Sequence, residues 1–289
     1  MEVLSLTNDA VFKLFFASPD NEDLLIQFLQ IVLELTDPIK KVTLLNPGLP
    51  KDMLDDKALI VDLMVLSQSG ERFHVEMQTR QHGFFKERIA YYNSKAHTNQ
   101  LTKGIGYDEI KKTISVIITD FTLFEEEAAY HNGFMFRNQN GLVLTNVQQI
   151  HTLELTKLPD EVKTEKEKWL RLFKAKGAKE MEQLAQTSSV ITKAVVKLKE
   201  LSADEEAREI ARMRENAVRL NATIENVARK QGIEEGIEIG REEGREEGRE
   251  EGAFKKAYEM AKKMLDMGLD TEQVMQVSEL SREDIEKLK

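Results

Sequence analysis

The stretch that most constrains this chain is Ala58–Gln78, in which two apolar runs flank the turn-forming segment Ser67–Glu71. This pattern predicts a β-hairpin. Each run contains one acid at a position where an apolar residue is expected, Asp62 in the first run and Glu76 in the second. If the turn is centred near Ser69, antiparallel pairing places these two acids directly opposite each other.

Two carboxylates that face each other across a hairpin are unfavourable, because like charges repel and because burial raises the pKa of one of them. A divalent metal ion between them removes both costs, and hard cations prefer oxygen ligands. The side-chain period of two also places Gln78 on the same face of the strand as Glu76. The hairpin therefore predicts a metal site.

The composition excludes several classes of protein. The chain has 289 residues and no cysteine, which excludes disulfides and thiolate zinc sites. Its beginning lacks the basic and apolar regions of a signal peptide. No apolar run approaches the ~18 residues of a membrane span. We expect a cytoplasmic protein that has no membrane partner.

The charge distribution bears on the class of substrate. The net charge of −10 argues against nucleic-acid binding, but residues 80–112 carry seven basic and three acidic side chains. A basic face beside a pair of carboxylates is what a phosphodiester substrate needs. The alternative interpretation is a solvated helix face with no binding role.

The first half of the chain mixes helices and strands around one sheet. Helices are expected at residues 7–19, 21–35 and 82–101, and strands at residues 40–45, 58–78 and 113–124, with two more strands between residues 130 and 155. Asp9 reads as a helix cap or a first-turn acid, and a role at the metal site is the alternative. These elements predict an α/β (α+β) fold.

The second half is helical from about Lys163 onward. Six glycines recur every four residues in Gly232–Gly252, and each costs about 1 kcal/mol relative to alanine inside a helix. A linker or a marginal helix is favoured over a glycine stripe that lets another helix approach closely. The tail, residues 253–289, predicts three short helices. Their spacing is that of a helix-turn-helix, although their acidic balance favours a small helical appendage.

The hairpin also carries a motif. An Asp, about a dozen residues and then Glu-X-Lys on the second strand is the pattern of PD-(D/E)XK nucleases, and here Gln78 replaces the lysine. With its surroundings the chain resembles the Rpn family of bacterial recombination-promoting, transposase-like nucleases. The matching segments are NDAVFKLFF (8–16), HVEMQ (74–78), RIAYYNSKAHTNQLTKGIGY (88–107), ISVIITDF (114–121), IHTLEL (150–155), the Trp169 cluster, the glycine repeat and MLDMGL (264–269).

The resemblance implies a restriction-endonuclease-like mixed sheet flanked by helices, followed by an all-helical C-terminal region. It implies a Mg²⁺-dependent DNA endonuclease, with Mn²⁺ or Ca²⁺ as alternative ions, connected with recombination, transposition or phage defence. Asp62 and Glu76 would bind the metal, together with the backbone carbonyl of Met77. Gln78 would take the place of the lysine and orient a water through its amide.

Other residues are assigned near the site more loosely. Arg88, Tyr92 and Asp9 match positions close to the active site in the family pattern, and Arg88 would suit a phosphate. Lys57, just before the first strand of the hairpin, could serve as a relocated basic group. This last assignment comes from the residues and not from the family.

The expected organisation has four parts. They are a nuclease domain (1–160), a helical extension (161–231), the glycine repeat (232–252) and a small helical tail (253–289). Two alternatives to a DNA endonuclease remain open. One is a homologue that binds DNA or regulates without cutting, and the other is a structural oligomer assembled through its helical half. A homodimer is compatible with cutting both strands of DNA.

Overall fold

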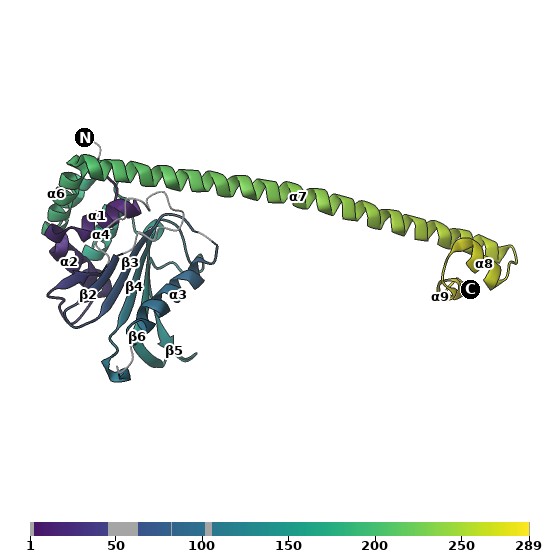
Figure 1. Cartoon of the computed structure of the whole chain (residues 1–289), viewed down its shortest axis with the longest axis horizontal. Helices are drawn as coiled ribbons and strands as arrows, with labels where there is room; N and C mark the ends of the chain where they lie inside the picture. Colours follow the sequence, from purple (N-terminus) through teal and green to yellow (C-terminus); the bar gives the residue numbers. More distant parts are fainter. Residues whose placement is uncertain (1–2, 46–62, 82, 102–105, 289) are drawn as a thin grey trace. The chain divides into compact units, whose positions relative to one another are not determined.

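The computed structural model of the chain describes residues 3–45, 63–81, 83–101 and 106–288. Two compact units are present, residues 1–219 and residues 220–289. The first unit combines a sheet with helices, and the second unit is helical (Figure 1).

A six-stranded sheet with the order β1-β2-β3-β4-β6-β5 organises the first unit. The strands are β1 (Val42–Leu44), β2 (Leu63–Ser67), β3 (Arg72–Gln78), β4 (Thr113–Thr119), β5 (His131–Arg137) and β6 (Val143–Glu154). β4 pairs in parallel with β3 and with β6, and the other pairs are antiparallel. Every residue of β4 is buried, as in the central strand of a sheet that is covered on both faces.

β2 and β3 form the predicted hairpin. Leu63 pairs with Val75, which centres the hairpin on Ser69 and confirms the predicted turn. Gly70 lies in this turn with φ at +86°, a conformation that glycine adopts without steric cost.

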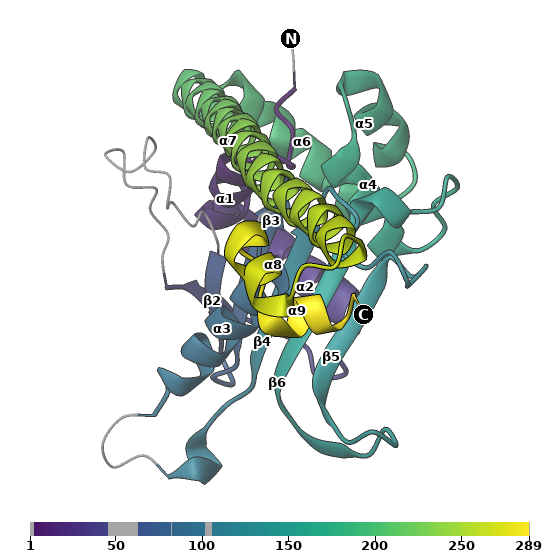
Figure 2. The same ribbon diagram turned by 90° about the vertical axis from the view of Figure 1, so that its right-hand side faces the viewer.

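Helices cover both faces of the sheet (Figures 1 and 2). Those within the first unit are α1 (Asp9–Ala17), α2 (Glu22–Leu33), α3 (Phe85–Thr98), α4 (Glu165–Lys174), α5 (Ala178–Ala185) and α6 (Ser189–Ala203), with short 3-10 helices η1 (Pro19–Asn21), η3 (Tyr107–Glu109) and η4 (Leu155–Lys157). α1, α2 and α4 share the main hydrophobic core with the sheet. α3 packs against the opposite face, where its own apolar residues meet those of β4.

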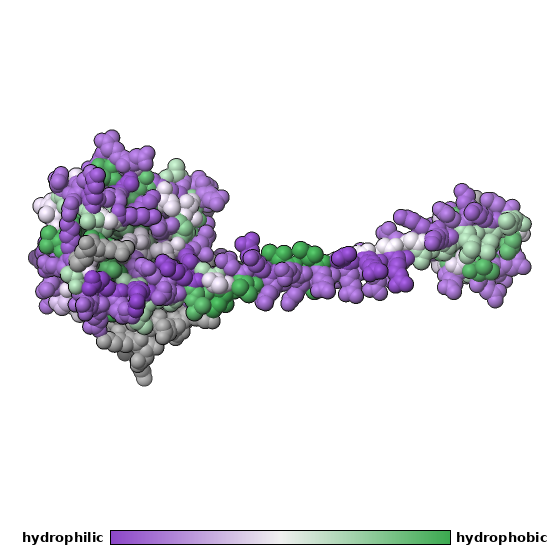
Figure 3. Space-filling model, turned by 90° about the horizontal axis from the view of Figure 1, so that it is seen from above, coloured by the Kyte–Doolittle hydropathy of each residue, from purple (hydrophilic) through white to green (hydrophobic). Residues whose placement is uncertain are grey.

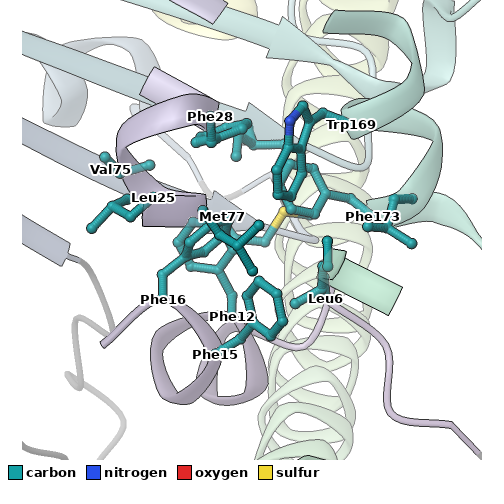
Figure 4. Close-up of a cluster of buried hydrophobic side chains, with 14 of the residues drawn as sticks. Leu6, Phe12, Phe15, Phe16, Leu25, Phe28, Val75, Met77, Trp169 and Phe173 are labelled. Carbon is teal, nitrogen blue, oxygen red and sulfur yellow. The ribbon is translucent and has the colours of Figure 1, made fainter. Parts of the chain in front are cut away.

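Aromatic rings fill the main core around Phe16 (Figure 4). The rings whose centroids lie 5.0 to 6.3 Å from that of Phe16 belong to Phe12, Phe15, Phe28, Trp169 and Phe173. Two of these rings come from α4, which lies beyond the expected boundary at residue 160. The helical region that follows the sheet therefore contributes to the same core.

The two faces of β3 point into different layers. Phe73, Val75 and Met77 belong to the main core. Because successive side chains of a strand alternate, Glu76 and Gln78 lie on the other face, which α3 covers. The packing of the core on one face of β3 thus decides which side chains of this strand lie on the opposite face, beneath α3.

The glycine repeat is part of a continuous helix. α7 (Glu205–Asp266) has 62 residues and runs through residues 232–252, so the structure has a helix here and not a linker. Helical segments precede and follow the repeat, and extending an existing helix avoids the costly nucleation step. A Cβ built on any of these six glycines would meet nothing within 4 Å, so no described helix packs on the glycine stripe.

The surface of α7 is mainly hydrophilic but carries exposed apolar side chains, including Leu220, Ile224 and Val227 (Figure 3). After α7 come α8 (Thr271–Ser278) and α9 (Arg282–Glu286). Asp270 and Ser281 cap these two helices, and the side chain of each accepts a hydrogen bond from a backbone N–H group. No helix in the described parts of the chain has the length and apolar character needed to cross a membrane.

Polar groups from four elements form a chain of hydrogen bonds on the sheet face that α2 and α4 cover. The ammonium of Lys166 on α4 donates to Glu34, at the end of α2, and to Nδ1 of His131 at 3.1 Å. His131 Nε2 lies 2.9 Å from Nδ1 of His151, whose Nε2 lies 3.2 Å from the Gln149 amide oxygen. The acceptor at His131 Nδ1 places the proton on Nε2 of each ring, so both histidines are neutral.

The electrostatics of this chain agree with the hydrogen bonds. Burial and the nearby Lys166 lower the pKa of His131 to about 4. The same causes lower the pKa of His151. Hydrogen bonding and the charge of Lys166 lower the pKa of Glu34, while burial and Glu167 raise the pKa of the neighbouring Tyr130.

Replacing His131 and His151 together by asparagine should flatten the pH dependence of stability between about pH 6.5 and pH 4. The unfolded chain binds protons first as the pH falls, because both pKa values are lower in the folded state. Wild-type stability is therefore complete above pH 6.5 and is lost toward pH 4. Urea unfolding at several pH values measures this loss. An equally steep loss in the double variant would contradict the prediction.

Candidate active site

Glu76 and Arg88 form an ion pair between β3 and α3. Glu76 is 8% exposed, and Arg88 Nη2 donates to its Oε1 at 3.1 Å. A buried carboxylate is costly unless a cation and hydrogen bonds compensate its charge. The pair therefore fixes a charged group on the face of the sheet that α3 covers.

The packing of α3 positions Arg88. Phe85 and Ile89 on either side of it are buried against Ile117 of β4. The guanidinium of Arg88 lies 4.9 Å from the centroid of the Phe85 ring, a cation–π contact. Because the helix is anchored through both neighbours, Arg88 is held against the sheet.

Gln78 and Met77 complete the end of β3. Gln78 is partly exposed, two residues beyond Glu76 on the same face, and its carbonyl accepts a hydrogen bond from the Asp120 N–H at 3.0 Å. Burial raises the pKa of the Asp120 carboxyl. The Met77 side chain is 1% exposed within the core, so its backbone carbonyl is the group it can offer to a metal.

Tyr92 lies one turn after Arg88 on α3. It lines a pocket of about 160 Å³ together with Met64 of β2, His74 of β3 and Lys95. Tyr92 is thus placed over the predicted hairpin, on the same face as Glu76. The structure brings together Glu76, Arg88 and Tyr92 on this face.

Asp9 makes its contacts with α7. Asn8 caps α1, and Asp9 is the acid of its first turn. Both carboxylate oxygens of Asp9 accept hydrogen bonds from Arg214 of α7, at 2.5 to 2.9 Å, and one also accepts the Ala10 N–H. These contacts join the beginning of the chain to α7, and a role of Asp9 at the metal site stays a prediction.

One residue that the sequence reasoning missed is Asn93. It is 2% exposed and donates hydrogen bonds to the Ser115 hydroxyl at 2.9 Å and to the Gln149 carbonyl at 3.0 Å. These bonds tie α3 to β4 and β6. The available signal was an amide four residues after Ile89 and eight after Phe85, which places it on the same side of the helix as these apolar residues.

The remaining predicted residues, Asp62 and Lys57, lie outside the described residues. Among the residues that are described, no three His, Asp or Glu side chains gather closely enough to hold a metal ion. The carboxylate of Glu76 and the backbone carbonyl of Met77 are nonetheless donors of the type that Mg²⁺ prefers. They fit a site whose further carboxylate would be Asp62.

The C-terminal tail is similar to a known domain. Residues 254–289 match the Rpn/YhgA-like nuclease family C-terminal HTH domain. This match supports the helix-turn-helix interpretation over the simple appendage that the acidic balance favours. Neither the curated proteins nor the solved structures gave a match to the chain.

The larger match covers the sheet and its helices. Residues 6–226 match the PD-(D/E)XK nuclease family transposase model. The mixed sheet with flanking helices and the helical C-terminal region agree with the fold that this family implies. The expected fold is thereby confirmed, and the chain belongs to the PD-(D/E)XK nuclease family of transposases of the Rpn type.

Proposed function

We propose that this protein is a metal-dependent endonuclease that hydrolyses phosphodiester bonds in DNA. The observation that carries the proposal is the buried Glu76 on β3, paired with Arg88 from α3. A carboxylate and a cation fixed on one face of a sheet can address a metal ion and a phosphate at the same place. A link with recombination, transposition or phage defence would follow from the family.

The metal would be held by Asp62, Glu76 and the carbonyl of Met77. Mg²⁺ is the expected ion, with Mn²⁺ and Ca²⁺ as alternatives. When bound, such an ion polarises the scissile phosphate and lowers the pKa of a water molecule. Gln78, next on the same face as Glu76, would orient that water through its amide oxygen.

The cations of α3 would bind the DNA backbone. Lys86, Arg88 and Lys95 lie on this helix, with Glu87 as its one acid. Arg88 uses one nitrogen for Glu76 at 3.1 Å, and its other N–H groups are suited to a phosphate oxygen. Tyr92 would contact the substrate on the same side. This positive charge is local to α3 and contrasts with the net charge of −10 of the whole chain.

A second candidate function is DNA binding with little or no cleavage. Gln78 favours it, because a glutamine supplies no positive charge where other PD-(D/E)XK nucleases have a lysine. The C-terminal HTH match gives the chain a second region that would bind DNA. Measurement of cleavage separates the two functions.

Replacing Glu76 by glutamine should lower metal-dependent nicking of supercoiled plasmid at least 100-fold. The change keeps the size of the side chain but removes its charge, which we assign to the metal. The control is Glu87→Gln, which removes an exposed charge of α3 and should nick like wild type. Nicking is measured with Mg²⁺, Mn²⁺ and Ca²⁺, and thermal unfolding checks the fold.

Two results of this experiment would decide between the candidates. Wild type that nicks with none of the three ions, yet binds DNA, would support binding without cleavage. Nicking by Glu76→Gln at the wild-type rate would remove Glu76 from the metal site.

Replacing Arg88 by alanine should weaken DNA binding and reduce the slope of log Kd against log salt by about 1, the contribution of one phosphate contact. The matched control is Lys193→Ala. Lys193 also pairs with an acid, Asp23 at 2.6 Å, but belongs to α6. Fluorescence anisotropy at several salt concentrations measures the affinity of each variant for DNA and the slope of its salt dependence. An unchanged slope in Arg88→Ala would show that this residue meets no phosphate.

A further inference from the structure

A pocket of about 230 Å³ lies between α3 and the β5–β6 hairpin. Its apolar lining includes Phe134, Phe136 and Ile150, and its polar lining includes Asn93, Ser94 and Gln148. The volume is below the ~300–1,000 Å³ of pockets for drug-sized ligands. It suits one flat ring system with polar edges.

Two exposed aromatic rings line this pocket. Phe134 is 44% exposed and Phe136 is 50% exposed. The Phe134 ring also contacts Phe124, at 5.4 Å between centroids, and the ammonium of Lys86 lies 4.4 Å from the centroid of Phe124. A cation therefore lies one ring away from an exposed aromatic face. Stacking faces beside cations are what proteins use to bind unpaired nucleotides.

The polar wall of the pocket is held in place by hydrogen bonds. Asn93 is fixed by its bonds to Ser115 and to the Gln149 carbonyl. Its amide oxygen accepts a hydrogen bond from Gln148 Nε2 at 3.4 Å. Within the described part of the chain, the amide oxygen of Gln148 has no hydrogen-bond partner. It can accept a hydrogen bond from the edge of a nucleobase.

The pocket and the candidate active site share one face of the sheet. Glu76 on β3 pairs with β4, which in turn pairs with β6, where Ile150 lies in the pocket. Ile150 lies two residues along β6 from Thr152, which is level with Glu76, so two strand spacings of ~4.8 Å and two residue rises of ~3.3 Å give a separation of roughly 12 Å. Along α3, the six residues from Arg88 to Ser94 rise about 9 Å. Such a span corresponds to one or two nucleotides of an extended strand.

We propose that this pocket binds one unstacked base of the DNA strand, close to the phosphate that Arg88 would contact beside the metal site. The inference rests on the proposed nuclease function and names its substrate class, DNA with unpaired bases. Charge complementarity favours DNA as the occupant, because α3 beside the pocket has three cations and one acid. Single-stranded or locally unpaired DNA is thus preferred over a continuous duplex, in which every base is stacked.

Binding is tested in the full chain with Glu76→Gln, which separates binding from cleavage. The probes are a paired duplex, the same duplex with three unpaired nucleotides, and a version whose unpaired positions are abasic. We expect the unpaired DNA to bind about tenfold more tightly than the other two, since stacking contributes ~1–3 kcal/mol per base. A 2-aminopurine at the unpaired position should lose fluorescence on binding.

Variants of the pocket sharpen the test. Phe134→Ala should remove the preference and the fluorescence change, and Phe134→Tyr should keep both. The control is Leu142→Ala, because Leu142 is 72% exposed near the tip of the same hairpin but does not line the pocket. It should behave like the parent protein. Thermal unfolding confirms that each variant is folded.

Three outcomes would overturn the proposal. The first is equal affinity for the paired duplex and the duplex with unpaired nucleotides. The second is equal affinity for the unpaired DNA with and without its bases. The third is a Phe134→Ala variant that still prefers unpaired DNA. If Phe134→Ala instead lowers the mass in solution and leaves the DNA preference unchanged, the patch binds a second copy of the chain. Failure of wild type to cleave any DNA would overturn the nuclease function alone, because these measurements require no cleavage.

Discussion

The alternation of side chains along β3 is the constraint on which the candidate site depends. Val75 and Met77 must enter the aromatic core around Phe16, and Glu76 between them must therefore face α3. A slip of one residue in register would place the carboxylate among aromatic rings and expose the apolar side chains. The favourable burial of Val75 and Met77 in the core thus fixes the position of the Glu76 carboxylate. Arg88 compensates the negative charge of that carboxylate.

Much of the first unit was predictable, because its signals are local. The turn residues near Gly70 and the apolar runs beside them determined the hairpin and its centre at Ser69. The packing of Trp169 into the core was not predictable, since its partners lie more than a hundred residues earlier in the chain. For residues 232–252 the sequence left a linker and a marginal helix open, because propensity counts each glycine but omits the cooperativity supplied by the neighbouring helix.

The candidate site also has parts that were predictable from the sequence and parts that were not. Glu76 was predicted because an acid inside an apolar run is visible without a structure, and Arg88 was assigned from the resemblance to the family. The pocket formed by Asn93, Phe134 and Gln148 was not, because it combines side chains from α3, β5 and β6 that have no common spacing. Asp9 shows the limit of a cap signal. The signal located the start of α1, but not the partner Arg214 on α7.

The substitution at Gln78 connects the two proposals. A lysine beside the metal would supply a positive charge, and glutamine supplies an amide only. Arg88, a cation on this face, is already bonded to Glu76 at 3.1 Å. Catalysis would then depend more on how accurately the phosphate is placed, which is a matter of binding energy. A base held by Phe134 and Gln148 would supply that energy about one or two nucleotides away, so the pocket would compensate for the missing charge by positioning the strand.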